Sequence, residues 1–225
     1  YKELGEVFAA LGRSDGANCA ILTGAGGRAF CAGKDLKEFL AASVEDDPRS
    51  ALVVRTCFQA IHECAIPVIA AVNGPALGAG AVIAACCDIR IAATSAKFAL
   101  PEINVGRCGG GAHLGRLMPQ GAMRRMFFTG EPISAEEAYR LDLVDALCAA
   151  PELMATAMAM AEKIAAKAPL GLRIGKRALN QAESLPLFEG YAPEQKASTE
   201  LMATKDAREA TAAVVEKRAP RFVGA

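Results

Sequence analysis

The fold is decided by one stretch, residues 67–88, which reads PVIAAVNGPALGAGAVIAACCD. The apolar run 68–72 predicts a buried strand, the sequence Asn73-Gly74-Pro75 predicts a tight turn, and the segment that ends near Cys87 predicts an apolar helix. A strand that turns sharply into a helix leaves the first backbone N–H groups of that helix without partners. Such groups can stabilise a negative charge that develops on a ligand. The small residues at 76 and 78–81 let a ligand approach the backbone closely.

The composition is that of an ordinary globular protein. The 225 residues are 52% hydrophobic and 22% charged, and 25 basic residues balance 25 acidic ones. A net charge of zero and an aromatic content of 5% without tryptophan argue against a nucleic-acid partner. The sequence has no run of about 18 apolar residues, so we expect no membrane span.

Cysteine and histidine usage bears on metal binding and on location. The eight cysteines form no CxxC pair and only two histidines are present, so we expect no metal site. Cysteines scattered through apolar runs are typical of a reducing cytosol, and we therefore expect a cytoplasmic protein. The sequence starts at Tyr1, without Met, inside helical spacing, so we expect that an N-terminal piece is absent.

Predicted strands and helices alternate along the first 150 residues, which is typical of an α/β fold with mostly parallel strands. From residue 151 on, the periodicity predicts helices alone. A composition shift near Ala168 divides the chain into an α/β core, residues 1–167, and a helical C-terminal region, residues 168–225. Among the elements that we expect in the core are helices at 1–11 and 50–64, a polar loop at 42–49, and strands at 19–23 and 89–93.

A glycine turn follows the first predicted strand and reads TGAGG at residues 23–27. A dinucleotide-binding fingerprint needs three spaced glycines that open directly into a helix. Here the chain continues as extended backbone through Arg28, Ala29 and Phe30, and isolated glycine turns after strands are common. We therefore expect no nicotinamide cofactor.

Several motifs in order along the chain resemble the enoyl-CoA hydratase/isomerase (crotonase) family. Each is weak alone, but the set covers nearly the whole chain at ordinary spacing. The motifs are ILTG at 21–24, FCAGKDL at 30–36, AVNGPALGAG at 71–80, CDIR at 87–90, the pair Pro101-Glu102, FTGEPISAEEA at 128–138, and EKR at 216–218. The opening strands of the family are missing from the sequence, in agreement with an absent N-terminal piece.

The resemblance implies a fold, an assembly and a substrate class. The fold is a spiral of ββα units with two roughly perpendicular sheets and a helical C-terminal region, which in this family makes homotrimers that often pair into hexamers. The substrate is an acyl-CoA thioester of fatty acid metabolism, so coenzyme A enters as part of the substrate. The resemblance implies no separate cofactor and no metal.

The resemblance also implies the site. The backbone N–H groups of Lys34 and Ala79 correspond to the oxyanion hole that binds the thioester oxygen once a proton next to the carbonyl is removed. A donor of this kind is typically worth about 3 kcal/mol. The other residues implied in substrate or CoA binding are Ala32, Gly33, Asp35, Leu36, Gly78, Val82 and His113.

The acid and base groups decide which reaction occurs. Hydratases of the family carry two glutamates, one three residues after the second oxyanion position and one in the Pro-Glu pair. Here those positions hold Val82 and Glu102. Two carboxylates that grip one water favour hydration, whereas a single carboxylate can take a proton from C2 and return it at C4. A desolvated glutamate among apolar residues has a raised pKa, which suits this shuttle.

We therefore favour Δ3-Δ2 enoyl-CoA isomerisation with Glu102 as general base and acid. Three alternatives stay open: an enoyl-CoA hydratase with a single glutamate, an acyl-CoA hydrolase or decarboxylase, and a homologue that binds acyl-CoA without catalysis. Glu131 is either a second acid or a residue of a solvated turn. Lys217 either reaches a CoA phosphate or is solvated. We expect Asp88 to anchor a turn, and the thiols of Cys86 and Cys87 to be buried in the core and unreactive.

Overall fold

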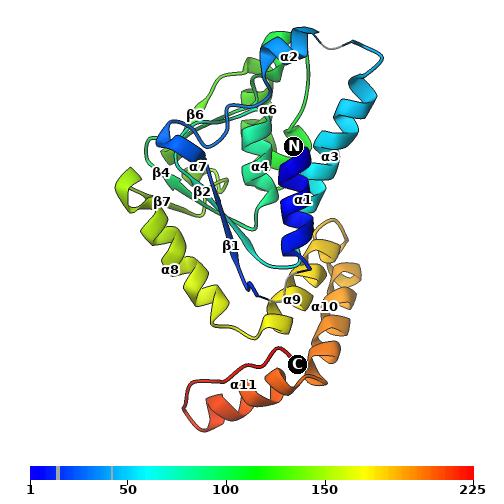
Figure 1. Ribbon diagram of the computed structural model, residues 1–225, viewed down its shortest axis with the longest axis vertical. Helices are drawn as coiled ribbons and strands as arrows, with labels where there is room; N and C mark the ends of the chain where they lie inside the picture. Colours follow the sequence, from blue (N-terminus) through cyan, green and yellow to red (C-terminus); the bar gives the residue numbers. More distant parts are fainter. Residues whose placement is uncertain (14–15, 42) are drawn as a thin grey trace.

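The computed structural model describes residues 1–13, 16–41 and 43–225, and its larger sheet is wholly parallel (Figure 1). The strand order is β1-β2-β4-β7. In register, Ile21 lies opposite Ile69, and Ile69 lies opposite Ile89. The parallel arrangement confirms the prediction from the alternating strands and helices. The four strands are β1 Ala20–Thr23, β2 Val68–Val72, β4 Ile89–Ala93 and β7 Ala146–Cys148.

A second, smaller sheet has the order β3-β5-β6. Its strands β3 and β5 are parallel and β5 and β6 are antiparallel. Cys31 forms an isolated parallel bridge with Ala76 of β3, so the segment that follows β1 runs beside this sheet. The three strands are β3 Ala76–Leu77, β5 Lys97–Ala99 and β6 Ile133–Ser134.

Both faces of the larger sheet are covered, because alternate side chains of a strand point to opposite faces. Ile69 and Ala71 of β2 pack on one face with Leu153 of α8, while Val68 and Val72 belong to the main core on the other face. All five residues of β2 are buried. The helices of the core are α1 Lys2–Leu11, α2 Leu36–Ala41, α3 Asp47–His62, α4 Ala79–Cys86, α5 Gly111–Leu114, α6 Gln120–Thr129, α7 Ala135–Arg140 and α8 Leu153–Ala165, with short 3₁₀ turns η1 Ala25–Gly27, η2 Pro101–Val105 and η3 Ala150–Glu152.

Helix α4 is apolar on every side and nearly all of it is buried. It begins at Ala79, at the end of the turn that follows β3, and it packs against α3 and α5. Small residues make this possible, because α4 has the sequence AGAVIAAC and its neighbours can approach its backbone. The prediction of a buried strand, a tight turn and an apolar helix over residues 67–88 is confirmed, with the short strand β3 added between turn and helix.

Helix α3 begins earlier than expected. The prediction of a helix at 50–64 preceded by a polar loop at 42–49 is wrong at its start, because α3 runs Asp47–His62. Pro48 lies in the first turn of the helix, where its missing N–H group has no role and its fixed φ is favourable. Residue 42, the first of the expected loop, lies outside the described residues.

The C-terminal helices extend away from the core (Figure 1). Helices α9 and α10 pack on each other through a separate apolar cluster of Ile174, Ala178 and Ala197. One tie to the core is an ion pair in which Lys176 Nζ lies 2.7 Å from Asp88 Oδ2. The division of the chain at residue 168 stays a prediction. The three helices are α9 Pro169–Ala182, α10 Leu187–Met202 and α11 Lys205–Val215.

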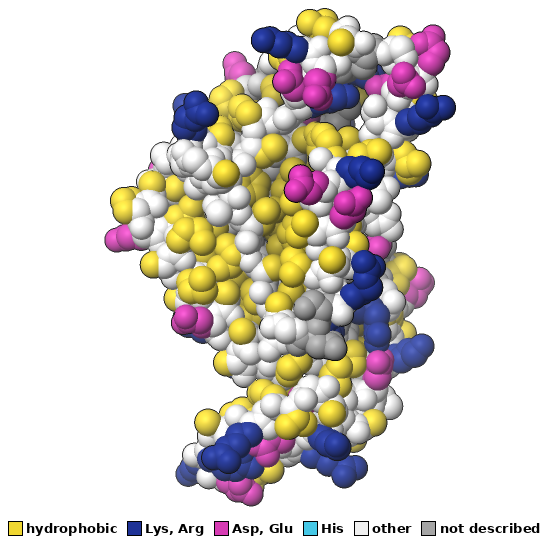
Figure 2. All heavy atoms as spheres, in the orientation of Figure 1, with side chains coloured by type: hydrophobic (Ala, Val, Ile, Leu, Met, Phe, Trp, Pro, Cys, Tyr) yellow, Lys and Arg dark blue, Asp and Glu magenta, His cyan; other side chains and the backbone are white. Residues whose placement is uncertain are grey.

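Apolar and charged side chains occupy different parts of one face of the molecule. Figure 2 shows one face on which hydrophobic side chains gather over the centre of the molecule, while Lys, Arg, Asp and Glu lie mostly around its rim. Within the part of the chain that the structure describes, none of the helices combines the length and hydrophobicity that a membrane crossing requires.

Candidate active site

The turn before α4 requires glycine at residue 78. Gly78 has φ +55°, a region that side chains rarely adopt, and its N–H group donates to the Ala99 carbonyl at 2.9 Å. A Cβ atom added here would lie 2.7 Å from Glu102 Oε1. Ala79 follows as the first residue of α4, so its N–H group has no acceptor within the helix. The turn therefore presents a backbone donor next to the Glu102 carboxylate.

A second turn lies directly against the first. Gly33 has φ +93°, and a Cβ atom on it would lie 3.0 Å from the Leu77 carbonyl oxygen and 3.9 Å from the Ala79 nitrogen. Lys34 is the next residue, so its backbone is near that of Ala79. Two turns that are about 45 residues apart in the sequence thus meet at one place. This is the arrangement expected for the two proposed oxyanion donors.

Close packing fixes the relative position of these two turns. A Cβ atom on Gly80 would lie 2.1 Å from the Cys31 carbonyl oxygen. The N–H group of Leu77 donates to the same oxygen at 2.9 Å. Because backbone contacts backbone here, neither turn can shift without disturbing the other.

Glu102 lies in the short turn η2 and its side chain is in a desolvated place. Its Oε2 atom is buried and has no hydrogen-bond partner within the described residues. Burial raises the pKa of this carboxyl, against a smaller opposing effect of a backbone hydrogen bond from its own residue. The prediction of a raised pKa is confirmed. A carboxylate with a raised pKa and free lone pairs is suited to exchange a proton with a substrate.

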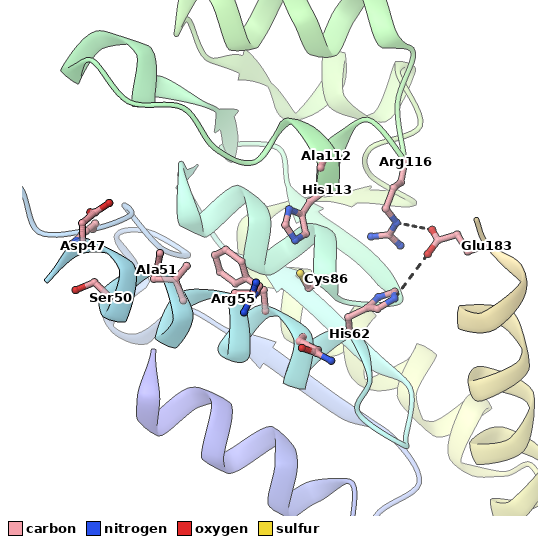
Figure 3. Close-up of a pocket in the computed structure, with 14 residues that line it drawn as sticks. Asp47, Ser50, Ala51, Arg55, His62, Cys86, Ala112, His113, Arg116 and Glu183 are labelled. Carbon is pink, nitrogen blue, oxygen red and sulfur yellow. Dashed lines mark hydrogen bonds and ion pairs between the residues drawn. The ribbon is translucent and has the colours of Figure 1, made fainter. Parts of the chain in front are cut away.

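These groups line one cavity of about 480 Å³. The predicted site residues that it contains are Ala32, Gly33, Lys34, Leu36, Gly78, Ala79, Val82 and Glu102. Two predicted residues do not line it. Asp35 is exposed and its Oδ1 atom accepts a hydrogen bond from the Lys37 N–H group at 2.7 Å, so it caps α2. His113 instead lines an adjoining cavity (Figure 3).

Val82 forms an apolar wall of the cavity. Its side chain is 2% exposed. Gly110, with φ +78°, lies over it, and a Cβ atom there would lie 3.0 Å from Val82 Cγ2. Among the described residues that line this cavity, Glu102 is the one with a carboxylate. The structure therefore places a hydrocarbon where a second carboxylate would be needed to hold a water.

Sequence reasoning missed the aromatic wall of the cavity. Tyr1 and Phe58 line it, and their rings meet edge to face with centroids 6.1 Å apart. Burial, with smaller effects of Cys31, Cys57 and Glu102, raises the pKa of Tyr1 to about 12. Phe58 is partly buried in α3 and Tyr1 precedes α1, and no local signal says that either of them faces a cavity.

The other candidates lie outside this cavity. Glu131 is exposed in a turn in which its N–H group bonds to Thr129 Oγ1 at 3.2 Å. Asp88 Oδ2 accepts hydrogen bonds from the Val68 N–H group at 2.6 Å and from Lys176 Nζ at 2.7 Å, so it anchors a strand and a helix. Cys86 and Cys87 are buried, and burial raises the pKa of both thiols. Lys217 is exposed.

An α/β core that holds two abutting backbone turns beside one desolvated carboxylate is the architecture of an acyl-transfer or enolate-forming enzyme. The comparisons give the particular family: the enoyl-CoA hydratase/isomerase family model matches residues 1–225, and the chain belongs to that family. The resemblance noted in the sequence is thereby confirmed.

Relatives and solved structures agree with this assignment. The chain is 36% identical to the short-chain-enoyl-CoA hydratase of Clostridium acetobutylicum over 220 residues, which cover 96% of this chain and 84% of the relative. It is 38% identical to the 2,3-dehydroadipyl-CoA hydratase of Escherichia coli over 211 residues, which cover 91% of this chain and 80% of the relative. The structure of the enoyl-CoA hydratase of Bacillus anthracis matches with a TM-score of 0.95 at 36% identity and covers 99% and 88% of the two chains.

These comparisons establish the crotonase fold and the enzyme family. The curated relatives quoted above are named as hydratases, so the preference for isomerisation over hydration stays a prediction.

Proposed function

We propose that this enzyme converts enoyl-CoA thioesters through an enolate, with Glu102 as the single proton-transfer group and the N–H groups of Lys34 and Ala79 as oxyanion donors. The observation that carries this proposal is the pairing of a desolvated Glu102 with the apolar Val82 in one cavity. Removal of a proton at C2 places negative charge on the thioester oxygen. Two fixed amides that need no reorganisation stabilise that charge by about 3 kcal/mol each.

The favoured reaction is Δ3-Δ2 isomerisation. Glu102 takes a proton from C2 and returns it at C4, so the double bond moves into conjugation and the carboxylate is regenerated. The reaction needs no water and no second acid. The apolar wall at Val82 supports it, because such a wall keeps water away from the enolate.

Hydration is the second candidate, and the names of the relatives favour it. Water must then be activated by Glu102 alone, and the oxyanion donors supply the rest of the catalysis. Hydrolysis of the thioester, decarboxylation and binding without turnover are further outcomes that the same site permits.

Assembly and location belong to the same proposal. We propose a homotrimer or hexamer, supported by large apolar side chains on the C-terminal helices, such as Phe188, which is 85% exposed. A cytoplasmic location is supported by cysteines that are all free thiols.

The test supplies trans-3-hexenoyl-CoA and trans-2-hexenoyl-CoA separately and follows the products by chromatography. Interconversion of the two without a hydroxyacyl product supports isomerisation, whereas water addition as the main reaction supports hydration. Release of free CoA identifies a hydrolase. Glu102→Gln is expected to lower turnover about 100-fold to 10,000-fold while acyl-CoA binding is retained. The matched control is Glu131→Gln, and equal effects of the two changes would refute the assignment of Glu102.

A further inference from the structure

A second cavity, of about 550 Å³, adjoins the catalytic cavity, and Lys34, Val54 and Phe58 line both. From this shared wall the second cavity runs along α3 to His62 (Figure 3). The α3 segment from Val54 to His62 spans about 12 Å. An acyl group whose thioester lies at the catalytic turns can therefore extend into this space.

Apolar and charged side chains both line the second cavity, and its far end is polar. Val54 and Phe58 supply hydrocarbon at the shared wall beside Lys34, and Cys86 adds a sulfur atom to the lining. At the far end, Arg116 Nε lies 2.6 Å from Glu183 Oε1, and His62 lies 3.9 Å from the other oxygen of Glu183 (Figure 3). A plain alkyl chain that reached this end would desolvate charged groups without replacing their hydrogen bonds.

Two groups of this cavity have no hydrogen-bond or ion-pair partner within the described residues. His113 Nδ1 is buried without a hydrogen-bond partner, while its ring is held against Phe58 with centroids 5.5 Å apart. Arg55, an exposed residue, also lines the cavity, and within the described residues its side chain makes no hydrogen bond or ion pair. The buried His113 nitrogen costs free energy unless a ligand supplies a partner.

The charges along this cavity favour an anion. Arg116 is paired with Glu183 at the far end, Asp47 at the opposite end is paired with Arg107, and Arg55 lies between them on α3. Lys34 at the shared wall adds a further positive charge. Burial, with added effects of Arg116 and His62, lowers the pKa of His113, so its ring is neutral and can donate one N–H group.

We propose that this second cavity selects acyl-CoA thioesters whose acyl chain ends in a carboxylate, which accepts hydrogen bonds from His113 Nδ1 and the Arg55 guanidinium. This inference rests on the proposed function, because it takes the thioester to lie at the catalytic turns. It adds the substrate class that the catalytic cavity alone does not define.

The test measures binding, which is independent of the reaction catalysed. Adipyl-CoA is compared with hexanoyl-CoA, and suberyl-CoA with octanoyl-CoA, by titration calorimetry on the unmodified enzyme. At least one ω-carboxyl thioester is expected to bind about 10-fold to 100-fold more tightly than its methyl-ended partner, the ratio for one hydrogen bond to a charged group. Equal affinities in both pairs would overturn the inference. Failure of all four thioesters to bind would overturn the proposed function as well.

Variants separate the cavity from the fold. His113→Phe keeps an aromatic ring and removes the nitrogen, and Arg55→Gln removes the charge, so each is expected to reduce the ratio towards one. Glu183→Gln removes the competing carboxylate and is expected to increase it. The matched control is Arg49→Gln on the same helix, because Arg49 lines neither cavity and its side chain is 89% exposed. A ratio that falls equally in the control would refute the assignment of the carboxylate to this cavity.

Discussion

Replacement of Val82 by glutamate tests which reaction the site favours. A positioned acid or base typically contributes about 100-fold to 10,000-fold, which is ~3–5 kcal/mol of transition-state stabilisation. Val82 lines the catalytic cavity together with Glu102, so a glutamate at residue 82 can direct its carboxylate into that space. The hydration rate of trans-2-hexenoyl-CoA is therefore expected to rise by up to this factor in Val82→Glu.

The structure also sets the cost of this change. Val82 is 2% exposed and Gly110 lies directly over it, so the longer side chain costs about 1–3 kcal/mol of stability through overpacking. The new carboxylate lies near Glu102, and the two groups titrate as a coupled pair. Chemical denaturation measures this cost in stability. Hydration rates are compared only for variants that remain folded at the assay temperature.

The assay follows loss of the conjugated thioester absorbance and separates 3-hydroxyacyl-CoA by chromatography. Val82→Gln is the matched control, because it has nearly the same shape but cannot exchange a proton at neutral pH. A gain in Val82→Glu that Val82→Gln lacks supports the reasoning. A folded Val82→Glu that binds acyl-CoA without any gain in hydration, or an equal gain in both variants, would refute it.

Four further predictions concern stability and pH. Gly80→Ala is expected to lower the free energy of unfolding by about 1–3 kcal/mol, measured by denaturant titration, because its Cβ would clash with the Cys31 carbonyl. Lys176→Ala is expected to cost about 1.5–3 kcal/mol in the same measurement, because it removes the buried ammonium group that donates to the partly exposed Asp88 carboxylate, which keeps its hydrogen bond from the Val68 N–H group. The raised pKa of Glu102 places the acidic limb of the pH–rate profile above the ordinary carboxyl range, since the protonated form cannot act as a base. Because burial disfavours the charged form of Glu102, Glu102→Gln is expected to raise thermal stability at neutral pH. This gain should vanish below the ordinary glutamate pKa of about 4.3, where the carboxyl is protonated in both the folded and the unfolded state.

Controls exist for each of these predictions. Gly175 lies in α9 and a Cβ atom added there would meet no heavy atom within 4 Å, so Gly175→Ala is expected to stabilise the protein by up to about 1 kcal/mol. Lys167→Ala changes an exposed lysine and should be neutral. The linkage argument for Glu102 has a definite sign: its folded pKa is raised, so wild-type stability falls as pH rises through that pKa. A stability gain in Glu102→Gln that persisted at low pH would contradict it.

Local signals were sufficient for the elements that carry strong patterns. Strands β2 and β4 have the predicted bounds, because apolar runs flanked by turn residues have one reasonable assignment. Ser134 caps α7, with its Oγ accepting from the Glu137 N–H group at 3.2 Å. Helix α10 runs through Pro193 and lies in the region from residue 151 on for which the periodicity predicts helices.

The rest depended on contacts between distant segments. No local pattern shows that Tyr1 reaches the cavity of Glu102, because that contact needs α1 to pack on α3 and α3 to pack on α4. His113 was expected at the substrate and lies in the second cavity, since α5 directs it towards Phe58. Asp35 was expected to contact CoA as part of the segment 32–36, through its backbone, and that contact stays a prediction, while its carboxylate caps α2.

The abutting turns at Gly33 and Gly78 have a consequence for how this enzyme can vary. The polar atoms that they present to the cavity belong to the main chain, so exchange of the side chain at Lys34 or Ala79 leaves those atoms in place. A scan of side-chain substitutions would therefore score these two residues as tolerant, and would assign importance to the glycines beside them. Replacement of a single amide by an ester, which deletes the N–H group and keeps the side chain, is the change that would reveal their contribution.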